Sequence, residues 1–453
     1  MTIPTFGTDG IRGRAGIELT SAVAEALGRA ASEILGGFRF VIGSDTRQSG
    51  PGLVAALTRG LAVNGVAVDD LGVVPTPAVA WTSADRGAAG AMISASHNPY
   101  PDNGIKLFAP GGLKLRDDVE ARIQSRYMEL ASVASRAVQA DGPSEAALLG
   151  GAELQVSDPA LVAGWMDSIT GSVQPGALDG LYLVLDCAHG AAYAVAPEIF
   201  RRLGADVTVI GDQPDGININ DDVGSTAPDK LITTVLSTGA DAGLAFDGDA
   251  DRVIAVGHDG HVIDGDRVLG LLAMDWAAND RLRDNTVVVT VMTNLGFHRA
   301  MAAAGIKVLT TSVGDRYVLA ALDDHGLSLG GEQSGHVICR DLATTGDGIL
   351  AGVQLLDVVA RRGEQLSDMA DAVMATVPQI LRNVTLPARN PNAAEAIAAE
   401  VEIVSAAFGD NGRVVVRPSG TEPLLRIMVE HVDSSTAKKA VEELVTAAER
   451  SLG

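Results

Sequence analysis

The chain has 453 residues, with 34 Lys and Arg against 57 Asp and Glu, so its formal net charge is -23. A chain this long exceeds the size of one hydrophobic core, and several domains are expected. The negative charge and the lack of a basic stripe with aromatics disfavour a nucleic-acid partner, and no uncharged run approaches the roughly 18 apolar residues of a membrane helix.

The N-terminus and the cysteines both indicate the cytoplasm. The first residues, "MTIPTFGTDG", contain no basic region followed by an apolar stretch. Cys187 and Cys339 stand in apolar, strand-like surroundings without metal-ligand spacing. We expect both to be buried, reduced thiols in a cytoplasmic protein.

Three stretches of the chain repeat one plan, in which a strand, a loop, an amphipathic helix and a glycine lead into a second strand. They cover residues 38–72, 181–211 and 285–314. Near-continuous Val, Ile and Leu in the strands indicates sheets that are covered on both faces. The sequence therefore predicts three similar mixed α/β domains.

The C-terminal part has a different pattern. Residues 412–432 predict two strands around a loop, and 434–452 predict a helix capped by Ser434 or Ser435. The expected fold is thus three similar α/β domains plus a smaller C-terminal α+β domain around a central cleft. The predicted domains are 1–150, 151–257, 258–370 and 371–453.

A polar loop follows the predicted strand at 89–93. The sequence "ISASHNPYPDNGIKLF" places Ser96 at the carboxyl end of that strand, where ligands gather in α/β sheets. A free serine hydroxyl is a weak nucleophile, so we favour a serine that carries a phosphoryl group and donates it. His97 has two open interpretations, as a group that orients phosphoryl oxygens or as a donor to backbone carbonyls.

An acidic loop lies between two apolar strands in "GLAFDGDADRVIAVG". Asp247, Asp249 and Asp251 alternate there and would repel one another without a cation. Carboxylate oxygens suit Mg²⁺, and the oxygens of a phosphorylated Ser96 would complete its coordination. The remaining negative charge requires nearby cations, for which the candidates are Arg12, Lys106 and Arg252.

Two further loops carry candidate substrate contacts. In "SLGGEQSGHVI", Glu332 and Ser334 suit sugar hydroxyls, while His336 is either a proton carrier or a structural residue. The loop of "RPSGTEPLLRIMVE" brings together cations and hydrogen-bond donors that could bind a phosphate group which does not react. These candidates are Arg417, Ser419, Gly420, Thr421 and Arg426. Together the four loops predict a phosphosugar substrate.

Five segments resemble the signature loops of the alpha-D-phosphohexomutase superfamily, in order and across nearly the whole chain. They are "FGTDGIRG", "ISASHNPYPDNGIKLF", "FDGDADR", "GGEQSGH" and "RPSGTEPLLRIMVE". Within the superfamily, "GGEQSGH", "PDGININ", "VMTNLGFH" and "SVGDRYVL" are most similar to bacterial members that act on glucosamine phosphate. The segment "VGSTAPD" and Phe246 depart from the forms common in those members, "CGSTHPE" and "HDGDADR".

The resemblance implies an intramolecular phosphotransferase that interconverts glucosamine 6-phosphate and glucosamine 1-phosphate, for UDP-N-acetylglucosamine and cell-wall synthesis. It implies phosphorylation at Ser96, one Mg²⁺ per subunit and glucosamine 1,6-bisphosphate as intermediate and activator. The general base stays open among Lys106, His336 and solvent. The expected partner is a small phosphosugar, and a homodimer is compatible with the sequence.

Three other functions would account for parts of this pattern. A phosphomannomutase or phosphoglucomutase would use the same loops on another sugar. A haloacid-dehalogenase-type phosphatase would use Asp247 as its nucleophile, but Asp251 stands where that pattern needs Thr or Val. A non-catalytic phosphosugar sensor would need no serine beside three aspartates.

Overall fold

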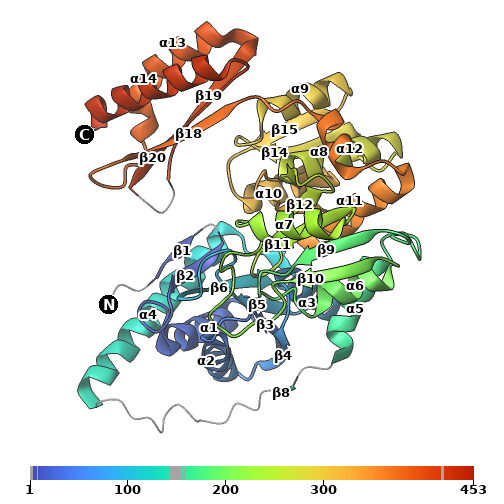
Figure 1. Cartoon of the computed structure of the whole chain (residues 1–453). Helices are drawn as coiled ribbons and strands as arrows, with labels where there is room; N and C mark the ends of the chain where they lie inside the picture. The colour runs from blue at the N-terminus through green and yellow to red at the C-terminus, as the bar shows by residue number, and fades with distance from the viewer. Residues whose placement is uncertain (1–3, 8, 142–154, 157–158, 420–422, 453) are drawn as a thin grey trace.

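The protein is described by a computed structural model over residues 4–452, except 8, 142–154, 157–158 and 420–422. Its sheets of 8, 5, 4 and 3 strands follow one another along the chain, each with its own helices (Figure 1). This arrangement confirms the predicted class of three mixed α/β domains and a smaller α+β domain. Among these residues, no helix has the length and apolar character needed to cross a bilayer.

The first domain is built on the 8-stranded sheet, in the order β1-β2-β6-β5-β3-β4-β8 with β7 on β6. Its elements are β1 (Phe6–Gly7), β2 (Gly10–Arg14), α1 (Ser21–Leu35), β3 (Arg39–Ser44), α2 (Gly50–Ala62), β4 (Ala67–Val73), α3 (Thr76–Arg86), β5 (Ala89–Ile93), β6 (Asp102–Ala109), β7 (Leu113–Lys114), α4 (Asp117–Asp141) and β8 (Gln155–Val156).

The second and third domains follow with sheets in the orders β10-β9-β11-β12-β13 and β15-β14-β16-β17. The second contains α5 (Pro159–Thr170), β9 (Tyr182–Asp186), α6 (Val195–Arg202), β10 (Asp206–Ile210), α7 (Asp229–Thr238), β11 (Ala242–Phe246), β12 (Val253–Gly257) and β13 (Val262–Ile263). The third contains α8 (Gly265–Ala278), η2 (Arg283–Asn285), β14 (Thr286–Thr290), α9 (Leu295–Ala303), β15 (Lys307–Thr311), α10 (Asp315–His325), β16 (Leu329–Gly331), β17 (Val337–Cys339), α11 (Gly348–Arg362) and α12 (Leu366–Val373).

The three α/β domains share one strand topology. In each, two strands lie parallel to a central strand, and the later of the two continues into an antiparallel neighbour. The hairpin loops at this equivalent position are residues 94–101, 247–252 and 332–336. The serine loop, the acidic loop and the sugar loop thus occupy the same place in three copies of one unit.

The C-terminal domain has the sheet order β18-β20-β19. It contains β18 (Gln379–Thr385), η3 (Ala393–Ile397), α13 (Ala398–Phe408), η4 (Gly409–Asn411), β19 (Gly412–Pro418), β20 (Leu424–His431) and α14 (Ser434–Leu452). The predicted cap of α14 was wrong by one residue. The Asp433 carboxylate accepts the backbone N–H groups of Ser435 and Thr436, which is the geometry of an N-cap.

The apolar cores also separate the C-terminal domain from the rest. One continuous core includes Val41 of β3, Leu185 of β9 and Val289 of β14, so it spans the first three domains. The C-terminal domain has its own core around Ile427 and Leu444, and in Figure 1 it stands apart at one end of the molecule. Cys187 and Cys339 are free and buried, as predicted.

The predicted domain boundaries at 150, 257 and 370 stay predictions. Strand β8, at 155–156, pairs with β4 of the first sheet. Helix α12 runs through position 370 and packs in the core of the first three domains, and β18 begins at Gln379.

Candidate active site

The serine loop and the acidic loop meet at Ser96. The Ser96 hydroxyl donates to Asp247 Oδ2 at 2.5 Å, and both residues are fully buried. Ser96 has a left-handed backbone with φ of 53°, which turns the chain sharply at the end of β5. The two loops approach so closely that a Cβ atom at Gly248 would lie 2.5 Å from the Ser96 carbonyl oxygen. Glycine is therefore required there.

The three aspartates form a buried cluster in which one carboxylate oxygen of each lies within 4.8 Å of the others. Burial, together with the charges of Asp251 and Asp249, raises the pKa of Asp247 well above its ordinary value. The Oδ1 atoms of Asp249 and Asp251 are buried without a hydrogen-bond partner. Such orphaned carboxylate oxygens fit a hard divalent cation, so the donor set could hold a metal ion.

Lys106, on β6, neutralises part of this cluster. Its buried Nζ lies 2.8 Å from Asp249 Oδ2, 3.1 Å from Asp251 Oδ2 and 2.8 Å from Asp9 Oδ2. Burial opposes the ammonium charge, but Asp249, Asp251 and Asp9 outweigh it and raise the Lys106 pKa well above its ordinary value. Lys106 is a cation in this arrangement, which suits it to charge balance better than to proton abstraction.

The other predicted cations also lie at the serine. The Arg252 backbone N–H donates to Asp247 Oδ1 at 3.2 Å, and Arg12 pairs with Asp9 at 2.8 Å. His97 Nδ1 lies 3.4 Å from Ser96 Oγ and 3.5 Å from Arg252 Nη1. Burial, then the charges of Arg252 and Arg12, lower the His97 pKa to about 4. A neutral imidazole therefore stands beside the serine hydroxyl.

The sugar loop reaches the same point from the third domain. His336 is buried, with Nδ1 3.6 Å from Asp251 Oδ1 and Nε2 3.6 Å from Asp315 Oδ2. Burial opposes its charge, but Asp251 and Asp315 raise its pKa above the ordinary value. Ser334 is exposed, and Glu332 Oε1 accepts the Gly314 N–H at 3.0 Å. The loop thus has one buried side against the acidic cluster, at His336, and one exposed side at Ser334.

The predicted phosphate loop lies in the C-terminal domain. Arg417 and Arg426 are directly opposite each other on β19 and β20. Burial and the neighbouring Arg426 lower the Arg417 pKa, while the Glu332 charge raises it. Two like charges side by side favour an anion between them. Ser419 is buried beside this pair, whereas Gly420 and Thr421 lie outside the described residues.

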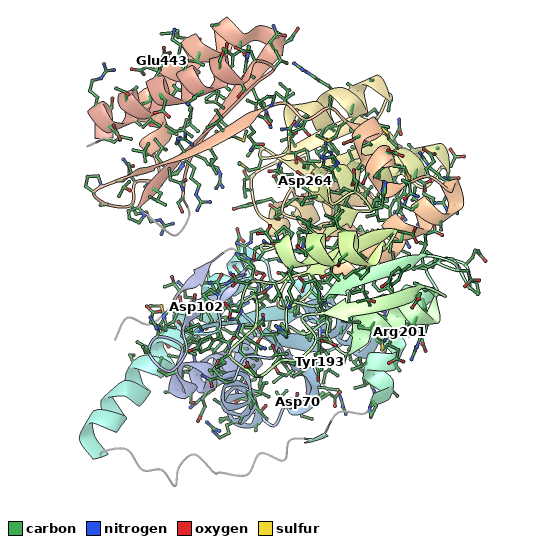
Figure 2. All side chains as sticks on the ribbon, viewed as in Figure 1. Asp70, Asp102, Tyr193, Arg201, Asp264 and Glu443 are labelled. Atoms are coloured by element: carbon green, nitrogen blue, oxygen red, sulfur yellow. The ribbon has the colours of Figure 1, made fainter. Side chains whose placement is uncertain are left out.

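Sequence reasoning missed Arg47, which holds the serine loop in place. Its guanidinium is fully buried, pairs with Asp45 at 2.9 Å and donates to four carbonyl oxygens, those of Ser96, Asn98, Pro99 and Asp102. Figure 2 labels Asp102 at the end of this loop. Asn220 donates to two of the same carbonyls, those of Ser96 and Asn98. The sequence did contain a signal for Arg47, because the polar segment "SDTR" follows a buried strand in the same way as the serine loop does.

Sequence reasoning also missed the ion pairs that connect the first three domains. Buried and half-buried charges of alternating sign form a closed ring, in which each group contacts the next; in order they are Asp9, Lys106, Asp251, His336, Asp315 and Lys114. Asp9 and both lysines belong to the first domain, Asp251 to the second, and His336 and Asp315 to the third. The ring therefore fixes the three loops relative to one another.

Comparison with known proteins places the whole chain among phosphohexose-processing proteins. Four family models match, described as phosphoglucomutase/phosphomannomutase alpha/beta/alpha domains I, II and III and C-terminal domain, over residues 4–133, 163–260, 264–377 and 381–447. The chain is 47% identical to a phosphoglucosamine mutase of Leifsonia xyli over 97% of both chains. It is 49% identical to a phosphoglucosamine mutase of Thermobifida fusca, over 97% of this chain and 96% of the relative.

Solved structures share the fold. A putative phosphomannomutase from Thermus thermophilus is 23% identical over 99% of both chains, with a TM-score of 0.79. An N-acetylphosphoglucosamine mutase of Aspergillus fumigatus, solved with GlcNAc-6P and magnesium, is 18% identical over 100% of this chain and 96% of that one, with a TM-score of 0.71.

Proposed function

Because the chain belongs to the phosphoglucomutase/phosphomannomutase family, we infer that it is a phosphosugar mutase that interconverts glucosamine 6-phosphate and glucosamine 1-phosphate. Apart from family membership, one contact in the site supports this inference. The Ser96 hydroxyl contacts Asp247 of a buried three-carboxylate cluster at 2.5 Å. A serine in this position can exchange a phosphoryl group beside a divalent cation.

The proposed reaction begins with phosphorylated Ser96. The free hydroxyl of the bound sugar attacks the phosphorus and loses its proton to a base, the bond between phosphorus and Ser96 Oγ breaks, and Oγ takes up a proton to become the free hydroxyl. The product, glucosamine 1,6-bisphosphate, reorients and returns its other phosphoryl group to Ser96, which restores the enzyme. The net product feeds UDP-N-acetylglucosamine and cell-wall synthesis in the cytoplasm, where we expect the protein to act.

The residues at Ser96 fit one Mg²⁺ per subunit. Asp247, Asp249 and Asp251 would hold it together with an oxygen of phosphorylated Ser96, and two of these carboxylates, those of Asp249 and Asp251, have a buried oxygen without a hydrogen bond. When bound, the ion offsets negative charge on the transferring phosphoryl group.

The surrounding cations offset most of the negative charge. Three carboxylates and a phosphoserine of charge near -2 exceed the charge of one Mg²⁺ by about three. Arg12, Lys106 and Arg252 supply positive charges at the site, although Asp9 also pairs with Arg12 and Lys106. His97, neutral and 3.4 Å from Ser96 Oγ, is placed to hydrogen-bond the transferring group.

The other two loops would bind the parts of the substrate that do not react. Glu332 and Ser334 would hydrogen-bond sugar hydroxyls, and His336 would face the reacting hydroxyl from the acidic cluster. Arg417, Ser419 and Arg426, with Gly420 and Thr421, would bind the second phosphate. The charge of Glu332 opposes burial and acts to raise the pKa of both Arg417, in the C-terminal domain, and Arg252, in the second domain. This shared influence supports a single site that the C-terminal domain helps to form.

Replacing Ser96 tests the proposed reaction. We expect Ser96→Ala to lower the turnover of glucosamine 6-phosphate at least about 1000-fold, since no other group receives the phosphoryl group. Intact-mass spectrometry should find one phosphoryl group on the wild type and none at position 96 of the variant. Ser237→Ala, on the exposed face of α7, is the matched control.

A mutase and its alternatives predict different outcomes. A Ser96→Ala protein that still releases phosphate at the wild-type rate would indicate a phosphatase that uses Asp247. A wild type without exchange of label between the 1- and 6-phosphates would indicate a sensor. Faster turnover of mannose or glucose phosphate than of glucosamine phosphate would correct the sugar and leave the mechanism in place.

A further inference from the structure

The sheet of the C-terminal domain has one face covered by helices and one face turned to the rest of the molecule. Ile380, Val414, Ile427 and Val429 point into the core with α14. On the other face, the cross-strand rows include Gln379–Glu430–Arg413, Leu381–Met428–Val415 and Asn383–Arg426–Arg417. We call these nine residues the open face. Two of these rows are charged, and the apolar row Leu381–Met428–Val415 separates them.

The first charged row contacts the third domain. Arg413 pairs with Glu430 across the strands and also donates to the Thr293 carbonyl oxygen. Glu430, which is fully buried, accepts the Leu295 N–H through Oε1 at 3.2 Å. The Arg413–Glu430 pair is therefore docked on the backbone that leads into α9, on both sides of Asn294.

Asn294 makes this docking point rigid. Its side chain exchanges two hydrogen bonds of 2.9 Å with the backbone of Val377, two residues before β18. Its backbone N–H donates to the buried carboxyl of Asp266 at 2.8 Å. The segment at 293–295 thus holds the entry to β18 on one side and the Arg413–Glu430 pair on the other.

The second charged row is the proposed phosphate site, four residues further along both strands. Arg413 and Arg417 lie on β19, and Glu430 and Arg426 lie opposite them on β20. Side chains four apart on a strand share a face, at a separation of about 13 Å. A paired antiparallel hairpin bends little over that length, so the position of one row determines the position of the other.

We propose that the Arg413–Glu430 pair is the positioning contact that sets where Arg417 and Arg426 stand relative to Ser96. The inference rests on the proposed mutase function, because it concerns how that site holds the phosphate that does not react. Arg413 acts through the hairpin and touches no substrate in this scheme. Its loss should weaken binding of ground state and transition state alike, which raises KM and leaves kcat nearly unchanged.

Kinetics on matched arginine variants give the first test. We expect Arg413→Met to raise the KM for the phosphosugar about tenfold or more with less than a threefold change in kcat, the effect of losing about one charge-assisted hydrogen bond to the phosphate. Arg382→Met is the control, since Arg382 lies on the helix side of the same sheet and pairs with Glu442. It should leave KM within twofold of the wild type.

A double-mutant cycle separates positioning from general damage. In a background that carries both Arg417→Met and Arg426→Met, Arg413→Met should change KM less than twofold, because both groups that it positions are already gone. An equal rise in KM in both backgrounds would overturn the proposal. If Arg413→Met fails to fold because Glu430 is left unpaired, the cycle uses Arg413→Gln with Glu430→Gln, a neutral pair of similar size.

Conservative replacement gives a graded effect on KM, and spectroscopy gives a readout that does not depend on the assigned substrate. Arg413→Lys keeps the charge but reaches one acceptor at a time, so KM should fall between wild type and Arg413→Met. Spin labels on Arg116→Cys and Lys439→Cys, both highly exposed in the wild type, would report the separation of the first and C-terminal domains. The buried native thiols should stay unlabelled.

The distance distribution from pulsed electron resonance should broaden or shift in Arg413→Met and not in Arg382→Met. An unchanged distribution would overturn the proposal even if the chain proved to act on another sugar. A changed distribution without activity on any phosphosugar would support the docking contact and count against the proposed function.

Discussion

The site around Ser96 and the phosphate site around Arg417 balance charge in different ways. At Ser96, three domains bring buried charges of opposite sign together, and the six-membered ring of ion pairs is complete without a ligand. At Arg417, two arginines lie side by side on a sheet that has its own core. The first region brings opposite charges together, whereas the second brings two like charges together on one face of a sheet.

The two regions also differ in how they are attached. The loops at Ser96 are hairpins of three sheets that share a continuous apolar core. The C-terminal sheet meets the third domain through a few polar contacts, among them the Arg413–Glu430 pair. Figure 2 shows Asp264 in the third domain on the side toward the C-terminal domain, and Glu443 on the outer, helical layer of that domain. We therefore expect chemistry to depend on the inner region and affinity on the outer one.

The largest effect should follow from disturbing the acidic cluster. Chelation of divalent cations should abolish turnover, and added Mg²⁺ should restore it, because the carboxylates and phosphoserine then regain their counter-charge. Asp249→Asn should lower kcat at least about 100-fold at saturating Mg²⁺, whereas Asp206→Asn at the surface should have no effect. Full activity in a chelator would show that the cluster has no metal role.

Removing Arg47 should cost most in stability. Arg47→Met leaves Asp45 buried without its ion pair and removes a donor from four loop carbonyls, of which only those of Ser96 and Asn98 keep Asn220, so the free energy of unfolding should fall by about 3–5 kcal/mol. Denaturant unfolding measures the change. Arg29→Met, at a half-exposed helical ion pair, should cost less than about 1 kcal/mol, and a similar cost at both positions would contradict the role of Arg47.

Arg417→Met tests the outer region. We expect the KM for the phosphosugar to rise about 10- to 100-fold with kcat nearly unchanged, since a charge-assisted hydrogen bond is worth about 1.5–3 kcal/mol. Inorganic phosphate should raise the Tm of the wild type and not that of the variant. Without phosphate the variant should be at least as stable as the wild type, because the repulsion with Arg426 is relieved. A loss of kcat with unchanged KM would place Arg417 in the chemistry instead.

The smallest effect concerns Asp266, on α8 where the two regions meet. Burial, opposed by the Asn294 N–H and reinforced by Asp264, raises its pKa to about 7. The folded protein thus keeps a proton that the unfolded chain loses near pH 4. The stabilisation is complete below about pH 4 and is lost as the pH rises toward 7.

Asp266→Asn removes this titration. Measured by denaturant unfolding, its stability relative to the wild type should increase between pH 4 and 7, by at most about 1.4 kcal/mol per pH unit, and stay level above pH 7. A difference that does not change with pH would show that Asp266 is ionised in the folded protein.

The sequence by itself determined the three α/β units, the C-terminal α+β domain and the residue types of the site. Strand patterns of Val, Ile and Leu predict sheets that are covered on both faces. Ser96 follows a buried strand, and the aspartates at 247–251 alternate in a loop where they would repel one another without a cation, so both local patterns indicate a functional site. The error at the α14 cap shows the limit of local reasoning. Asp433, Ser434 and Ser435 are all good caps, and only the backbone decided among them.

Only the tertiary structure decided which charges meet. Arg47 and Asn220 close on the serine loop from positions 49 and 124 residues away along the chain, and Lys114 reaches Asp315 across 201 residues. No periodicity or spacing encodes such contacts, because they depend on how three separate sheets pack. The same holds for the hairpin of the C-terminal domain, where alternation predicts which residues share a face, but only the tertiary structure brings Arg413 and Glu430 to the backbone at 293–295.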